Sequence, residues 1–131
     1  MDIPAPLSAE PRSSHMKAIV SEDQRSLERI KQLLVAFKDI DETMPIQIAI
    51  TFLEVAIHEG CSMTDIWHKT GWAQSTLSRH LLDLGERDRH KNPGLQLLES
   101  RRDPQELRKN IYTLTAKGRK LSQKLLSLLR M

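Results

Sequence analysis

The sequence has little of what an enzyme, a secreted protein or a membrane protein would need. Its one cysteine, Cys61, cannot form a disulfide within the chain and fits a reducing compartment, so we expect a cytoplasmic protein. No apolar run is long enough for a membrane span or a signal peptide. The sequence has no glycine-rich phosphate loop and no defensible Ser-His-Asp pattern, so we expect neither a catalytic site nor a cofactor. His58 and Cys61 are spaced like metal ligands, but no second pair follows, and no metal is expected.

Charge and composition divide the 131 residues into two parts. Residues 1–20 are rich in Pro, Ser and Ala and lack apolar periodicity, so we expect them to be disordered; Ser14-His15-Met16 within them resembles a cloning remnant. Residues 21–131 are predicted to form one domain. The net charge is only +3, but no acidic residue follows Leu107, whereas seven cations do. This distribution favours a polyanionic partner.

The segment 63–86 is predicted to form two short helices joined by a tight turn, the layout of a helix-turn-helix DNA-binding unit. Thr64 is expected to cap the first helix, and Gly71 to end it. In the second helix, three leucines recur at i, i+4 and i+7 and predict a buried stripe: Leu77, Leu81 and Leu84. The other side is left with small polar and basic residues: Gln74, Ser75, Thr76, Ser78, Arg79 and His80. The alternative is an ordinary helical hairpin with a solvated polar face.

The segment that follows is predicted to form a β-hairpin. Leu95–Arg101 is expected to be a strand, Arg102–Arg108 a polar loop and Lys109–Leu114 the return strand. A hairpin directly after such a helix is a wing, and its cations could lie along a phosphate backbone or enter a minor groove. Those cations are Arg101, Arg102, Arg108 and Lys109. In the alternative, the arginines pair with acidic residues of the same hairpin: Glu99, Asp103 and Glu106.

Three further helices are predicted. Pro45–Glu59 is apolar almost all round and is expected to be a buried central helix. Ser21–Ile40 and Thr115–Arg130 carry apolar stripes that exceed what one small domain can cover, so we expect them to bind a second copy. The predicted dimer interface consists of Leu27, Ile30, Leu34, Phe37, Leu121, Leu125, Leu128 and Leu129. The alternative is that the last helix packs back onto its own core.

The block DPQELRKNIYTLTAKGRKL resembles the wing-to-last-helix signature of the multiple-antibiotic-resistance-regulator (MarR) family of winged-helix transcription factors. The matching positions are Asp103, Arg108, Leu114, Thr115, Gly118 and Arg119. The segment TDIWHKTGWAQSTLSRHL resembles the helix-turn-helix of the same family. Three features depart from the family: Ala73 stands where a capping Ser or Thr is usual, Pro104–Leu107 stretches the wing spacing, and the chain ends soon after one C-terminal helix.

The residues and the resemblance together imply a mainly α fold with a small β-hairpin, a winged helix-turn-helix whose N- and C-terminal helices form a dimerisation region. We expect a homodimeric repressor that binds double-stranded DNA at a pseudo-palindromic operator. The second helix would contact base edges, the wing would contribute its cations, and phosphates would be held by Thr64, Ser78 and His80. The resemblance also implies a small-molecule effector, although the sequence shows no pocket for one. Two alternatives remain: a plasmid or phage replication or partition protein, and a protein-interaction winged helix that does not contact DNA.

Overall fold

The structure is a computed structural model that describes residues 21–88 and 90–131. Residues 1–20, for which the sequence predicts disorder, lie outside the described residues. In chain order the described elements are α2 (Glu22–Ile40), α3 (Ile46–Ile57), α4 (Met63–Thr70), α5 (Gln74–Leu84), β1 (Leu98–Asp103), β2 (Glu106–Leu114) and α6 (Ala116–Leu129). This is the mainly α fold with one small antiparallel hairpin that the sequence predicts.

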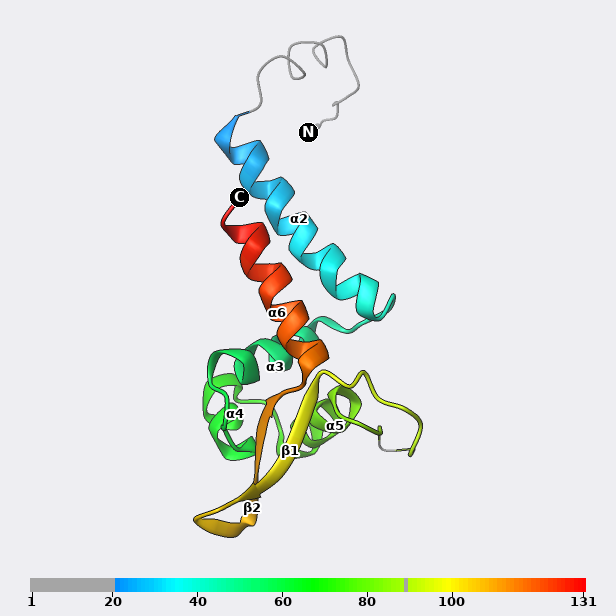
Figure 1. Cartoon of the computed structure of the whole chain (residues 1–131), viewed down its shortest axis with the longest axis vertical. Helices are drawn as coiled ribbons and strands as arrows, with labels where there is room; N and C mark the ends of the chain where they lie inside the picture. Colours follow the sequence, from blue (N-terminus) through cyan, green and yellow to red (C-terminus); the bar gives the residue numbers. More distant parts are fainter. Residues whose placement is uncertain (1–20, 89) are drawn as a thin grey trace.

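The elements gather at two ends of the molecule (Figure 1). Helices α2 and α6 lie side by side and extend away from the rest, and Lys124 Nζ of α6 comes within 3.9 Å of Asp39 Oδ2 of α2. Helices α3, α4 and α5 form the other end, beyond which the β1–β2 hairpin projects. The hairpin is anchored to the turn before α4, because Gly60 N–H donates to the Tyr112 carbonyl and Tyr112 N–H donates to the Cys61 carbonyl. These two bonds hold the base of the hairpin against the connection between α3 and α4.

Helix ends follow from local side-chain chemistry. Ser21 forms a capping box with Gln24 at the start of α2, and Gly71 ends α4 at a φ of +72°, where a residue without a Cβ is favoured. The prediction that Thr64 caps α4 is wrong. Ser62 is the cap, and its hydroxyl accepts from Asp65 N–H while its own N–H donates to the Asp65 carboxylate. The cap of α4 therefore lies two residues earlier than predicted, and Thr64 lies inside the first turn of the helix.

The core forms on one side of α3. Phe52 and Val55 of α3 are fully buried against Ile66 of α4 and Leu77 of α5. The expectation that α3 is buried all round is wrong, because its neighbours cover only one of its faces. Its opposite face exposes four apolar side chains at i, i+4, i+7 and i+11: Ile46, Ile50, Leu53 and Ile57. Their exposed fractions lie between 37% and 66%.

The hairpin is longer than the sequence pattern indicates. The predicted loop Arg102–Arg108 is largely strand: β1 runs to Asp103, β2 begins at Glu106, and two residues connect them. Leu95–Leu97, predicted as strand, instead follows the end of α5, with Leu97 N–H bonded to the Leu84 carbonyl. The wing is therefore a protruding two-stranded arm with a tight tip.

The segment that carries the family resemblance at the start of α6 has a structural role. Leu114 is buried, and the Thr115 hydroxyl caps α6 by accepting from Gly118 N–H at 3.0 Å. A Cβ built on Gly118 would lie 2.1 Å from the Leu97 carbonyl oxygen, so only glycine fits this close approach. Arg119 Nη1 lies 2.8 Å from Glu59 Oε2 and ties α6 to the end of α3. The motif thus joins the last helix to the strand and to α3.

Candidate nucleic-acid interface

Helix α5 has the two-sided character that the sequence predicts. Leu77, Leu81 and Leu84 are at most 4% exposed and face the core. The opposite side exposes Gln74, Ser75, Ser78 and Arg79, while Thr76 is half-buried. Ala73 provides no side-chain cap, so the first N–H groups of α5 receive no bond from a capping side chain. Such N–H groups, together with the positive end of the helix dipole, favour an anion.

His80 does not belong to this exposed face, and its prediction as a phosphate contact is wrong. It is 8% exposed, its Nδ1 lies 3.1 Å from Thr51 Oγ1 of α3, and the Trp72 ring meets it edge to face at 5.8 Å. Burial lowers the pKa of His80 below its usual value, and the positive charge of Arg79 also lowers it, while Asp83 opposes the shift. With Leu77, Leu81 and Leu84, His80 completes an i, i+3, i+4, i+7 pattern, which is the sequence signal that identifies it as a core residue.

The direction of the buried hydrogen bond follows from counting protons. The Thr51 hydroxyl donates its only proton to the Gln47 carbonyl at 2.9 Å, so the imidazole of His80 donates Nδ1–H to Thr51 Oγ1. Thr51 is fully buried, and water cannot replace this bond. The pair fixes the back of α5 against α3 and so fixes the direction in which the polar face of α5 points.

The wing presents guanidinium groups that no carboxylate neutralises. Within residues 21–88 and 90–131, no ion pair involves Arg101, Arg102 or Arg108, and all three are exposed. The described part of the hairpin therefore does not support the alternative in which these arginines pair with its acidic residues. Lys109, in contrast, approaches Glu106, with Nζ and Oε1 3.9 Å apart.

A groove with both polar and apolar lining residues, Leu82 and Tyr112 among the latter, joins α5 to the wing. It has a volume of about 810 Å³ and is lined by Ser78 of α5, Arg87 of the following loop, Ser100 of β1 and Asn110 of β2. Thr64, in the first turn of α4, is exposed as well. The groove therefore connects the polar side of α5 with the two strands that carry the arginines of the wing.

The predicted dimer residues fall into two groups. Leu27, Ile30, Leu34 and Leu129 are at least half exposed, as a surface that binds a partner requires. Three others are buried in the core of their own chain, and for them the prediction is wrong: Phe37, Leu121 and Leu125 are each no more than 7% exposed. Leu128 is half-buried beside them. The alternative in which α6 folds back is thus correct for the inner face of this helix, because α2 lies alongside it.

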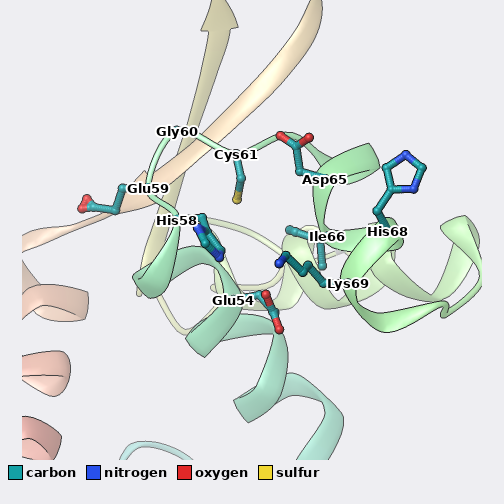
Figure 2. Close-up of a pocket in the computed structure, with 9 residues that line it drawn as sticks. All are labelled: Glu54, His58, Glu59, Gly60, Cys61, Asp65, Ile66, His68 and Lys69. Atoms are coloured by element: carbon teal, nitrogen blue, oxygen red, sulfur yellow. The ribbon is translucent and has the colours of Figure 1, made fainter.

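A pocket of about 390 Å³ lies between the end of α3 and the start of α4 (Figure 2). It contains His58 and the buried Cys61, and burial raises the pKa of the Cys61 thiol to about 11. Figure 2 shows Glu59 and His68 on opposite sides of this pocket. Asp65, a further lining residue, uses its carboxylate to cap α4. Among the residues that the structure describes, no group of three or more His, Cys, Asp and Glu side chains could hold a metal ion.

Each helix of the described residues falls short of the length or the apolar character that a membrane span requires. No protein-family model and no curated protein matches the chain.

Solved structures match nearly the whole described chain. An S. aureus MepR variant bound to an oligodeoxyribonucleotide aligns with a TM-score of 0.61 and 21% identity over 93% of this chain and 78% of that one. CouR, a transcriptional repressor bound to a 23-mer DNA duplex, aligns with a TM-score of 0.56 and 19% identity over 94% and 81%. Bordetella bronchiseptica BpsR, whose DNA binding is regulated by 6-hydroxynicotinic acid, aligns with a TM-score of 0.52 and 19% identity over 85% and 75%.

MarR itself is among the matched structures. The chain therefore has the winged-helix fold of the MarR-type structures, which confirms the fold that the sequence resemblance implies.

Proposed function

We propose that this protein is a transcriptional regulator that binds specific double-stranded DNA, and that it acts as a homodimeric repressor on a pseudo-palindromic operator. The observation that carries the proposal is a continuous surface. It runs from the polar side of α5 along the groove to the wing, where three exposed arginines form no ion pair with any described residue. A polar helix face suits base edges in the major groove, and guanidinium groups that no carboxylate neutralises suit phosphates. The DNA-bound MepR and CouR structures share the fold.

The surface suggests a role for each part. Gln74, Ser75, Thr76 and Arg79 would contact base edges, since they occupy the first turns of α5, opposite its leucines. Thr64 and Ser78 would bind phosphates. Lys109 and the three wing arginines would contact the DNA beyond the groove, at phosphates or in the minor groove.

Dimerisation would use exposed apolar side chains of the helices away from the wing. Leu27, Ile30 and Leu34 line one side of α2, and Leu34 and Ile46 line the same hollow, so this stripe continues onto the exposed face of α3. Leu129 adds the end of α6. Two copies joined in this way would place their α5 helices about one DNA turn apart, roughly 34–36 Å. Residues 21–131 would act as one DNA-binding and dimerisation domain.

A small-molecule effector is also part of the proposal. BpsR has the same fold, and 6-hydroxynicotinic acid regulates its DNA binding. An effector of this chain would act by changing the distance or angle between the two α5 helices, which must match the spacing of the half-sites.

The test is selection of bound duplexes from a random DNA pool at fixed physiological salt, followed by affinity measurement. Arg79→Ala should weaken binding to the selected duplex by roughly 5- to 150-fold and relax base preference at one position, as loss of a bidentate base contact does. The matched control is Arg25→Ala, which removes the same charge from an exposed position of α2, far along the chain from the wing. Its affinity should stay within about two-fold of the parent protein.

The selected sequences and the stoichiometry of the complex decide between the models. Inverted half-sites bound by two chains in sedimentation would support the homodimeric repressor. Directly repeated sites would favour a replication or partition protein. If the parent protein enriches no duplex and binds DNA only at low salt, it is not a specific DNA-binding protein.

A further inference from the structure

The tip of the wing contains an irregularity that its strand register makes visible. Arg102 lies opposite Asn110, but the next residue, Asp103, lies opposite Glu106. Three residues of β2, 107–109, therefore have no counterpart on β1. A bulge of this kind ends regular pairing and turns side chains away from the ladder.

Specific hydrogen bonds hold the bulge in shape. Arg102 Nη1 donates to the Leu107 carbonyl at 2.7 Å, across the tip from β1 to β2. At the turn, the Asp103 carboxylate accepts from Gln105 N–H at 2.9 Å. These two bonds restrict the shape of the tip before binding, which lowers the conformational entropy that binding costs.

The residue that this bulge displays is apolar. Leu107 is 66% exposed, and among the described residues of the hairpin it is the only large aliphatic side chain that is mostly exposed. Its neighbours on either side are Glu106 and Arg108, and Arg108 forms no ion pair with any described residue. A leucine at a protruding tip adds nothing to the core, so its position suits a surface that becomes buried on binding.

We propose that Leu107 is a wedge that enters the minor groove beside Arg108 and inserts between two base pairs, kinking the duplex. This inference rests on the proposed DNA-binding function. The minor groove of B-DNA is about 6 Å wide, and two paired strands are already about 4.8 Å apart, so side chains at the tip can enter where the whole arm cannot. Arginine is favoured in a narrow minor groove, and leucine is one of the residues that unstack a base step there.

The wedge predicts a preference for particular base steps at a position where the protein makes no hydrogen bond to a base. Pyrimidine–purine steps such as TA and CA unstack most easily, so the operator should carry one at the position that the wing reaches. Replacing that step with a stiff A-tract should weaken binding by the parent protein about as much as removal of the leucine does.

The experiment uses the duplex that the parent protein selects from a random pool, with 2-aminopurine at successive purines of the wing-proximal minor groove and a donor–acceptor pair at its ends. Binding of the parent should raise the fluorescence of one 2-aminopurine, because the base loses its stacking partner, and should bring the two ends closer. Leu107→Ala should abolish both signals and weaken binding by about ten-fold, since the apolar area that it buries is lost. Leu107→Met should restore both signals.

Gln105→Ala is the control at the same tip. It removes a neighbouring exposed side chain but leaves the backbone N–H that bonds to Asp103, so both fluorescence signals should persist. A parent protein that binds its duplex without unstacking any base would refute the wedge and leave the proposed function intact. Unchanged signals with Leu107→Ala would refute it equally. A parent protein that selects no duplex would overturn the proposed function and the wedge together.

Discussion

Replacing Thr51 with valine tests whether the buried Thr51–His80 hydrogen bond positions α5. Valine has nearly the same shape and is also branched at Cβ, so the substitution changes the helix preference of α3 little while removing the hydroxyl. Thr51 is fully buried and His80 is 8% exposed, so no water can take the place of the lost acceptor. A buried imidazole left with an unpaired polar atom costs about 1–3 kcal/mol, and we expect the free energy of unfolding to fall by that amount.

Urea unfolding followed by circular dichroism at pH 8, where His80 is neutral, measures this loss. A double-mutant cycle with His80→Leu isolates the bond from the other effects of each substitution. If the bond is real, the two losses should not add: once His80 is leucine, Thr51→Val should cost little or become favourable, with a coupling of about 1 kcal/mol or more. Additive losses, or a Thr51→Val protein as stable as the parent, would show that the two side chains are merely adjacent and that packing alone holds α5 in place.

Two further predictions concern pH and the approach of α6 to β1. Burial places the pKa of folded His80 below its usual value of 6.5, so the unfolded chain binds a proton first as the pH falls. The difference in the free energy of unfolding between the parent protein and His80→Leu should therefore be constant above pH 6.5. As the pH falls through 6.5 towards the folded pKa, the parent protein should lose stability relative to His80→Leu. A difference independent of pH would contradict the burial of His80. Gly118→Ala should lower the free energy of unfolding in the same assay by about 1–3 kcal/mol, because its Cβ would collide with the Leu97 carbonyl, and this outweighs the gain of roughly 1 kcal/mol in helix propensity. A more stable Gly118→Ala protein would mean that the two backbones move apart easily.

The architecture was predictable because local signals agreed with one another. The leucine spacing of α5, the glycine after α4 and the capping box of α2 each act within a few residues, and the structure contains all three. The helix-turn-helix and the hairpin therefore follow from short-range chemistry, and their order along the chain was enough to suggest the winged fold.

The wrong predictions concern residues whose spacing in the sequence is compatible with two different environments. His80 is a polar residue at a core spacing, so its chemistry favours the surface while its position favours the core. Its partner Thr51 lies 29 residues earlier and gives no local sign of the pairing. Phe37, Leu121 and Leu125 belong to true apolar stripes, but a stripe does not show whether its partner is the same chain or a second one. Leu107 was seen only as part of a stretched loop, because its exposure depends on a register shift between two strands.

The sequence by itself determined which segments form helices, which face of α5 is apolar, and that cations gather near the hairpin, because these properties depend on neighbours within one or two turns. Only the tertiary structure decided which apolar faces remain open and which polar side chain is buried. It also decided how the wing presents its tip. These outcomes depend on which distant segments lie against each other: α6 covers one side of α2, α5 brings His80 to Thr51, and Arg102 reaches across the hairpin to hold the Leu107 bulge.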